Sequence, residues 1–252
     1  MTETKPIRFM PNSAAADASG DRGGEPTLAT QFSRVSTRLA ALAPPEGAMA
    51  SIAALREFLL LADNLDSTYG ADATLPIADL EEATAIIMGD IGRIESWLTT
   101  YAQQHSIDDF DPITLGLALW VMRHRIPIRT CEPLVNALAR RANAATSRQE
   151  TAATYAIAQG LIEHVAPLLA ADLERSNPDR PWRVLNINFA ITAIRTGDTA
   201  LMRFAFDQLN TAIPAESAGF YTEALVLANQ PGFPAEAREL IAHECRRVSP
   251  TH

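Results

Sequence analysis

Cysteine, glycine and aromatic residues are scarce in this chain of 252 residues. The two cysteines, Cys131 and Cys245, stand far apart, and neither has the nearby second cysteine of a CxxC motif. Two isolated thiols argue against a disulfide-stapled scaffold and a thiolate zinc site, and they fit a reducing compartment. Glycine accounts for 12 residues and aromatic residues for 6% of the chain, and no segment alternates Val, Thr and Tyr between glycine-rich turns. A β-sandwich or β-barrel is therefore not expected.

Long apolar runs are also missing. No run approaches the roughly 20 residues that a membrane span needs, and Lys5 and Arg8 precede no apolar signal segment. The formal net charge of −9 lies in the first half, because residues through Asp111 include 17 acidic and 7 basic side chains and the remainder 13 and 14. Such a surface repels phosphate backbones and anionic lipids. We expect a cytoplasmic protein that binds neither nucleic acid nor membrane.

Helix-forming residues dominate what the sequence does contain. Alanine and leucine are abundant, and apolar residues recur at three- and four-residue spacing along most of the chain. Residues 1–30 differ because they join small, polar, glycine and proline residues with almost nothing to bury, which predicts a disordered tail. Residues 31–252 are predicted to form an all-α domain of antiparallel helix pairs, stacked as a short α-solenoid or a multi-helix bundle.

The stretch from Pro181 to Arg195 is expected to be the central helix of the fold. Pro181 suits a first turn, and Gly197 supplies a stop signal. Its apolar residues form two neighbouring stripes, one of Leu185, Phe189 and Ala193 and the other of Val184, Ile187, Ile191 and Ile194. A helix that is apolar around most of its circumference has to be covered on several sides. The alternative is a short central strand, because Val and Ile are β-branched.

Two helix starts carry clear signals elsewhere. In HSIDDFDP, residues 105–112, Asp111 is placed as an N-cap and Pro112 as the first residue of a helix. This predicts a turn and a candidate domain boundary near 105–111. Farther on, Ser147 and Glu150 have the spacing of a capping box, which predicts that a helix begins between them.

Groups of residues that could perform chemistry are few. Asp108, Asp109 and Asp111 form an acidic cluster, but the expected capping role of Asp111 explains it more simply than a magnesium site. Glu239 and His243 share a helix face and supply two ligands, fewer than a zinc site requires. The chain has no phosphate-binding loop, GxGxxG, HExxH or GxSxG motif. We therefore predict no catalytic residue, no metal site and no cofactor.

From Pro181 onward, the expected helices and turns recur at intervals of about 17 residues, so that each antiparallel pair spans about 34. In the first pair, Gly197-Asp198 form the turn between the two helices, and Ala190 lies at a small-residue position on the first helix. Phe206 is an aromatic residue on the second helix, and Pro214 ends the unit. In these features residues 181–248 resemble the tetratricopeptide repeat. Asn186 and Met202 depart from the pattern, because the family favours Trp and Ala at these places.

The resemblance implies a concave groove that is lined by the first helix of each pair and binds an extended peptide or a partner helix. Carried over position by position, the residues that face this groove would be Ile187, Ile191, Arg195, Tyr221 and Asn229. The competing interpretation is that Ile187 and Ile191 are simply core residues.

The expected function is that of a non-catalytic protein–protein interaction module: an adaptor, a scaffold or an accessory factor with a protein partner. The main alternative is an all-helical enzyme or small-ligand-binding protein with a pocket between helices. A third interpretation is a homo-oligomer that mates a large apolar face with its own copy. An enzyme predicts an enclosed pocket with convergent titratable groups, whereas an interaction module predicts an exposed apolar or charged groove.

Overall fold

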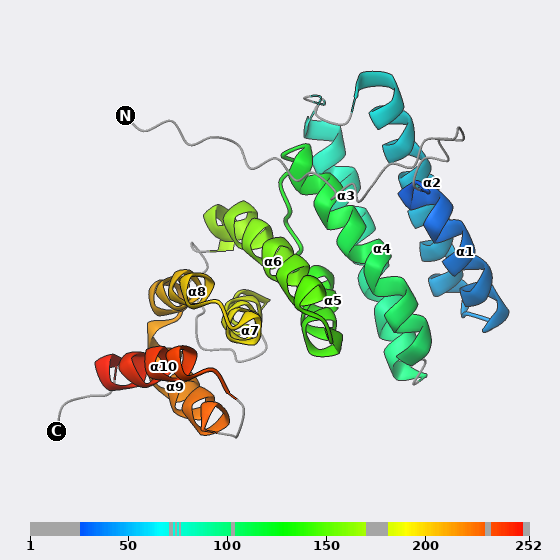
Figure 1. Ribbon diagram of the computed structural model, residues 1–252. Coiled ribbons are helices and arrows are strands. Elements are labelled where there is room, and N and C mark those ends of the chain that lie inside the picture. Colours follow the sequence, from blue (N-terminus) through cyan, green and yellow to red (C-terminus); the bar gives the residue numbers. More distant parts are fainter. Residues whose placement is uncertain are drawn as a thin grey trace, which may run out of the picture.

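The computed structural model describes residues 26–70, 73, 75, 77–101, 104–169, 181–229 and 233–248, which form ten α-helices and no strand (Figure 1). The helices are α1 (Leu28–Ala41), α2 (Glu46–Tyr69), α3 (Ile77–Thr100), α4 (Gln104–Arg123), α5 (Glu132–Ala144), α6 (Arg148–Leu169), α7 (Pro181–Thr196), α8 (Thr199–Ala212), α9 (Pro214–Ala228) and α10 (Ala235–Val248). The all-α prediction is confirmed. Residues 1–25 of the predicted tail lie outside the described residues, and α1 already begins at Leu28.

The helices pack as antiparallel pairs that follow one another along the molecule, from α1 and α2 at one end to α9 and α10 at the other (Figure 1). The pairs are α3 with α4, α5 with α6, α7 with α8, and α9 with α10. The first helix of a pair also contacts the preceding pair: α5 packs on α3 and α4, and α7 packs on α5 and α6. The first helices α3, α5 and α7 therefore follow one another as one layer, which we call the first-helix layer.

Helix α7 is the helix expected over 181–195, and the strand alternative is wrong. Leu185, Phe189 and Ala193 are fully buried beneath α5, α6 and α8, and the Phe189 ring stacks on Tyr155 of α6 with centroids 4.7 Å apart. The second stripe departs from the expectation, because its isoleucines are only partly buried. Helix α9 packs on α8 and α10 rather than along α7, so the isoleucine stripe keeps one side open.

The turn expected at 105–112 does not form. Helix α4 continues through this stretch, with Pro112 inside it. Ile107 and Phe110 on the near side of the proline are buried, and the Phe110 ring packs on Phe32 of α1 with centroids 6.4 Å apart. Burial of these side chains outweighs the cost of a proline inside a helix. No turn marks the candidate domain boundary near 105–111, and the division itself stays a prediction.

Asp111 is an internal ion-pair partner instead of an N-cap. Its carboxylate is buried and accepts hydrogen bonds from Arg140 of α5, with Nε 2.9 Å from Oδ2 and Nη2 2.7 Å from Oδ1. The same guanidinium reaches Glu95 of α3 through Nη1, at 2.6 Å. Burial raises the pKa of the Asp111 carboxyl, and the Arg140 guanidinium opposes this effect. One arginine therefore connects α3, α4 and α5.

The other aspartates of the acidic cluster have partners of their own. Asp109 forms an ion pair with Arg38 of α1 at 3.0 Å, and Asp108 accepts a hydrogen bond from Gln104 at 2.9 Å. Asp109 and Asp111 thus join α4 to other helices, whereas the Asp108 contact lies within α4.

The capping signals at Ser147 and Gly197 are confirmed. The amide of Glu150 donates to Ser147 Oγ at 3.1 Å, and the amide of Ser147 donates to the Glu150 carboxylate at 3.2 Å, which is the predicted capping box. Gly197 has a positive φ of 69° in the turn between α7 and α8. Asp198 then caps α8 by accepting from the amides of Ala200 and Leu201. The turn chemistry of the sequence is therefore sufficient to place these helix ends.

The last two pairs stack with a regular register. Arg183 of α7 forms an ion pair with Glu216 of α9, which stands 33 residues later. Asn210 of α8 donates to Glu244 of α10, which stands 34 residues later. Equivalent helices of the two pairs therefore lie opposite each other at offsets close to the pair length of about 34 residues expected over 181–248.

Candidate functional site

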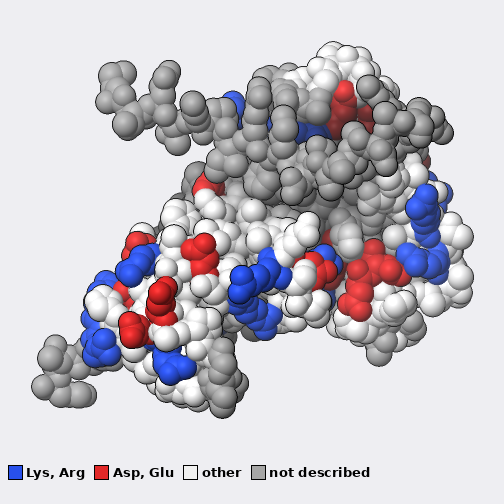
Figure 2. All heavy atoms as spheres, viewed as in Figure 1, with Lys and Arg blue, Asp and Glu red and all other residues white. Residues whose placement is uncertain are grey.

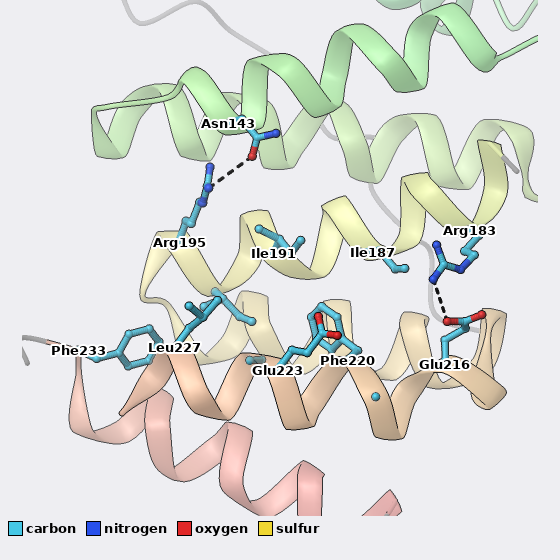
Figure 3. Close-up of a pocket in the computed structure, with 13 residues that line it drawn as sticks. Asn143, Arg183, Ile187, Ile191, Arg195, Glu216, Phe220, Glu223, Leu227 and Phe233 are labelled. Carbon is cyan, nitrogen blue, oxygen red and sulfur yellow. Dashed lines mark hydrogen bonds and ion pairs between the residues drawn. The ribbon is translucent and has the colours of Figure 1, made fainter. Parts of the chain in front are cut away.

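A groove lies between α7 and α9, the first helices of the last two pairs (Figure 3). Its volume is about 510 Å³, within the range of about 300–1,000 Å³ found for ligand sites. The two helices run in the same direction, because Arg183 and Glu216 meet at one end while Arg195 and Leu227 lie at the other. We call this feature the α7–α9 groove. Its lining consists of Asn143, Arg183, Ile187, Ile191, Ile194, Arg195, Glu216, Gly219, Phe220, Glu223, Ala224, Leu227 and Phe233.

Apolar side chains form the floor of the groove. Ile187 and Ile191 of α7 and Phe220 of α9 are half-buried, and Leu227 is 60% exposed. Phe220 is held by edge contacts with Phe206 and Tyr221, whose ring centroids lie 6.3 Å and 5.3 Å away. The floor is thus fixed from behind by the core while its outer side faces solvent. Apolar surface rimmed by polar residues is a feature of ligand-binding grooves and protein interaction sites.

Gly219 leaves a gap in the α9 wall of the groove. It lies inside α9 without a positive φ, and no other atom comes within 4 Å of the place that a Cβ would occupy. Neither backbone conformation nor internal packing therefore requires glycine here. A glycine in a helix interior costs about 0.5–1 kcal/mol relative to alanine. The residue lowers the stability of α9 and widens the groove.

The charged residues of the groove lie at its ends, with one exception. At one end, Arg183 and Glu216 pair at 3.0 Å, and the hydrogen bond from Arg183 holds the pKa of Glu216 below its ordinary value. At the other end, Arg195 donates to the backbone carbonyl of Ala142 and to Asn143 Oδ1 of α5. Glu223 lies between these ends, on the groove side of α9 beside Phe220 (Figure 3).

Three of the five residues predicted to face the groove do so. Ile187, Ile191 and Arg195 line it. Tyr221 is fully buried behind it, with its hydroxyl 3.2 Å from Asn210 Oδ1, and the exposed Asn229 follows the end of α9 outside the lining. Tyr221 stands 34 positions after Ile187, and Asn229 stands 34 positions after Arg195. The observed offset between α7 and α9 is 33 residues. A one-residue shift turns a side chain by about 100° around a helix, which moves both away from the groove.

The residues that sequence reasoning missed are mainly on α9. Gly219, Phe220, Glu223 and Leu227 line the groove together with Asn143 of α5. The 33-residue offset places Phe220 opposite Ile187, so the correct register would have identified this position. Asn143 carried no comparable signal, because it reaches the groove from the end of another pair.

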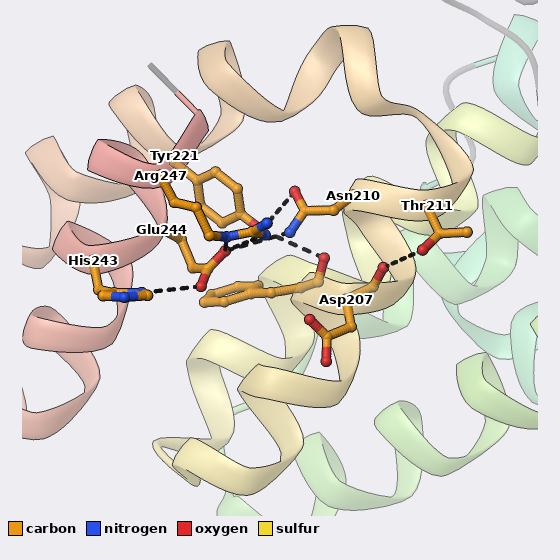
Figure 4. A network of polar contacts seen from close by, with 8 residues as sticks. Asp207, Asn210, Thr211, Tyr221, His243, Glu244 and Arg247 are labelled. Atoms are coloured by element: carbon orange, nitrogen blue, oxygen red, sulfur yellow. Dashed lines mark hydrogen bonds and ion pairs between the residues drawn. The ribbon is translucent and has the colours of Figure 1, made fainter. Parts of the chain in front are cut away.

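A polar network centred on the buried Glu244 joins α8, α9 and α10 behind the groove (Figure 4). Glu244 of α10 is 9% exposed and accepts from Arg247 Nη2 at 2.6 Å, His243 Nδ1 at 3.2 Å and Asn210 Nδ2 at 3.4 Å. Burial alone would raise the pKa of Glu244, but the hydrogen bonds from Arg247 and His243 hold it below its ordinary value. Burial also raises the pKa of the Tyr221 hydroxyl beside it. His243 is paired with Glu244 here, instead of the Glu239 considered from the sequence.

A second groove, of about 780 Å³, lies between α3 and α5, the preceding members of the first-helix layer. Its rim carries the hydroxyls of Ser96, Thr99 and Thr130 and the carboxamide of Asn136. Its buried charges, Glu95 and Arg140, are already paired with each other. Both grooves therefore open along the first helices, but the α7–α9 groove is the one whose lining includes a row of isoleucines and the ring of Phe220.

Within the described part of the chain, no three His, Cys, Asp or Glu side chains are grouped closely enough to hold a metal ion. Cys131 is buried, and burial raises the pKa of its thiol to about 11, which keeps it protonated and unreactive near neutral pH. None of the described helices has the length and apolar character needed to cross a membrane. On the face shown in Figure 2, acidic and basic side chains lie in small mixed groups between uncharged surface.

Comparisons with protein-family models, with curated proteins and with solved structures found no match for this chain. The resemblance of residues 181–248 to the tetratricopeptide repeat stays a prediction. Function has to be inferred from the chemistry of the α7–α9 groove.

Proposed function

We propose that this chain is a cytoplasmic, non-catalytic interaction module that binds an apolar segment of a protein partner in the α7–α9 groove. The observation that carries the proposal is the fixed, solvent-facing apolar floor formed by Ile187, Ile191, Phe220 and Leu227. Removing such surface from water stabilises a complex by about 25 cal/mol per Å² of apolar area. Because most of the lining comes from helices, binding does not require the protein to order a long loop.

The spacing of the floor fits side chains of a peptide. Ile187 and Ile191 stand one helical turn apart, and the lining of α7 continues to Ile194, so the stripe extends over about 10 Å. Two successive anchor residues of a bound helix, or alternate residues of an extended segment, are spaced to contact it. The gap at Gly219 gives a partner room to approach α9.

The distribution of charge favours this function over the enzyme alternative. Catalysis by side chains requires titratable groups brought together at one point. In the α7–α9 groove, Arg183 and Glu216 pair with each other at one end, Arg195 is bonded to α5 at the other, and Glu223 stands alone between them. The charges are spread along the groove, an arrangement suited to binding a chain.

We also propose that residues 181–248 form two units of a tetratricopeptide-like repeat. The offsets of 33 and 34 residues between equivalent helices support it. Ala190 and Ala237, at the small-residue positions, and Phe206, at the aromatic position, are all buried. Binding along the first helices of stacked pairs then follows from the architecture.

The test uses a library of random 12-residue peptides displayed on phage and selected against the full chain. Peptides from this selection are synthesised, and their affinities are measured by fluorescence anisotropy. Leu227→Arg places a charge in the groove at an exposed position. The bound peptide would lose an apolar contact with Leu227 and would meet a positive charge instead, so we expect its affinity to fall at least tenfold.

Val226→Arg is the matched control. Val226 is the neighbouring residue, is 67% exposed and lies outside the groove lining, so its substitution is expected to leave affinity within about twofold. The proposal is wrong if selection yields no binding peptides, or if Leu227→Arg and Val226→Arg affect their binding equally.

A further inference from the structure

The charged side chains that line the α7–α9 groove have hydrogen-bond or ion-pair partners among the described residues, except Glu223. Arg183 is matched by Glu216 at 3.0 Å. Arg195 donates to the carbonyl of Ala142 in the last turn of α5, where the helix dipole supplies partial negative charge. Among the described residues, none forms a hydrogen bond or ion pair with the Glu223 carboxylate, although it stands between an apolar floor and solvent. Glu223 is therefore the charged side chain of the lining that has no hydrogen bond or ion pair to a described residue.

Gly219 and Glu223 lie on the same face of α9, one turn apart. The absence of a side chain at Gly219 opens a path along α9 that ends at the Glu223 carboxylate, and the ring of Phe220 lies beside this path. A long aliphatic stem that carries a terminal cation fits such a path, since its methylene groups can cover apolar surface while its charge reaches the carboxylate. Lysine and arginine are the residues with this shape.

We infer that the segment bound in the α7–α9 groove is a basic amphipathic peptide, in which a Lys or Arg lies over Gly219 and pairs with Glu223 while neighbouring apolar residues contact Ile187, Ile191 and Leu227. This inference rests on the proposed function. It adds the charge of the partner, because an acidic segment would place its carboxylates against Glu223 without compensation.

The experiment compares selections from the same peptide library on the wild-type chain, on Glu223→Gln and on Glu223→Lys. Wild type is expected to select peptides in which a Lys or Arg adjoins apolar residues, and Glu223→Lys is expected to lose this preference. Glu239→Gln on α10 is the matched control for Glu223→Gln, since Glu239 is exposed and outside the groove but its substitution changes the net charge by the same one unit.

A double-mutant cycle then tests the contact itself. For a selected peptide, replacing its basic residue with methionine is expected to weaken affinity about fivefold, and so is replacing Glu223 with Gln. Both changes together are expected to weaken affinity no more than either change alone. Gly219→Ala fills the path with a methyl group, so it is expected to weaken the same peptide while raising the melting temperature of the chain.

The outcomes separate this inference from the proposed function. The basic-segment inference is overturned if the selected peptides depend on Leu227 but lack a basic residue. It is also overturned if the two affinity losses in the cycle are independent and multiply. Either result leaves the apolar groove as the binding site. If no selected peptide responds to Leu227→Arg, the groove is not the binding site and the proposed function itself fails. Unchanged affinity in Gly219→Ala would contradict the path over Gly219.

Discussion

Asp66 near the end of α2 connects more groups than its exposure suggests. Its carboxylate accepts from Trp120 Nε1 at 3.1 Å, from His124 Nε2 at 2.8 Å and from Arg123. His124 is 3% exposed, and its other ring nitrogen lies 3.0 Å from the backbone oxygen of Ala73. Both ring nitrogens thus lie within hydrogen-bond distance of an oxygen atom. A single carboxylate therefore ties the end of α4 to α2.

Replacing Asp66 with Ala is expected to destabilise the chain by about 2–3 kcal/mol, because it leaves buried donors of Trp120 and His124 without an acceptor. Urea unfolding followed by circular dichroism measures the change. Glu57→Ala on the same helix removes an equal charge from an exposed position and is expected to change stability by less than about 0.5 kcal/mol. Equal effects of the two substitutions would contradict the role assigned to Asp66.

At the scale of helices, α4 contains a proline that disfavours helical structure. Pro112 lies in the interior of α4 with its side chain exposed, and it cannot donate to the carbonyl four residues earlier. Pro112→Ala is expected to stabilise the chain by roughly 1–3 kcal/mol, since it restores this donor without disturbing the core. Thermal unfolding measures the gain. Pro214→Ala is the control, because Pro214 begins α9, where its missing amide hydrogen costs nothing, and a gain of similar size there would refute the explanation.

The attachment of α10 is expected to weaken in acid. The pKa of Glu244 lies below its ordinary value of 4.5, so its carboxylate contributes stability above that value and loses the contribution as pH falls through the lower, folded-state pKa. Between about pH 6 and pH 3, wild type should therefore lose more stability than Glu244→Gln. Denaturant unfolding across this range measures the difference. Parallel pH profiles for the two proteins would show that Glu244 carries no such contribution.

The limits of sequence reasoning are visible in these same elements. Capping and turn residues act on their immediate neighbours, so Ser147, Glu150 and Gly197 predicted helix ends correctly. Asp111 and Pro112 gave an equally strong local signal and it was wrong, because α1 and Arg140 of α5 act on α4 from positions far away in the sequence.

The groove shows a similar division. Periodicity placed Ile187 and Ile191 on one face of α7, but it could not decide whether a neighbour covers that face. The register between α7 and α9, 33 residues where 34 was expected, is set by packing of α9 and α10 on α8. The α7 side of the site could therefore be predicted from the sequence, and the α9 side could not.

At the scale of the whole molecule, the stack of pairs makes its last pair the least supported. Helix α5 contacts α3, α4, α6 and α7, whereas α9 and α10 pack on each other and on α8. In a stack whose units contact only neighbours, a terminal unit opens at lower free energy than an internal one. The open side of α7 contributes to this difference, because the α7–α9 groove replaces packing that would otherwise hold α9.

Hydrogen exchange measured by mass spectrometry is expected to show that the amides of α9 and α10 are protected less than those of α4 and α5. Tyr221→Phe removes the hydroxyl that contacts Asn210, so it should lower protection further in α9 and α10 and leave α4 and α5 unchanged. A peptide bound in the α7–α9 groove bridges α7 and α9, and it should raise protection of the last pair in both proteins. Uniform protection along the chain would mean that the pairs unfold as one cooperative unit. The α7–α9 groove would then not lower the local stability of α9.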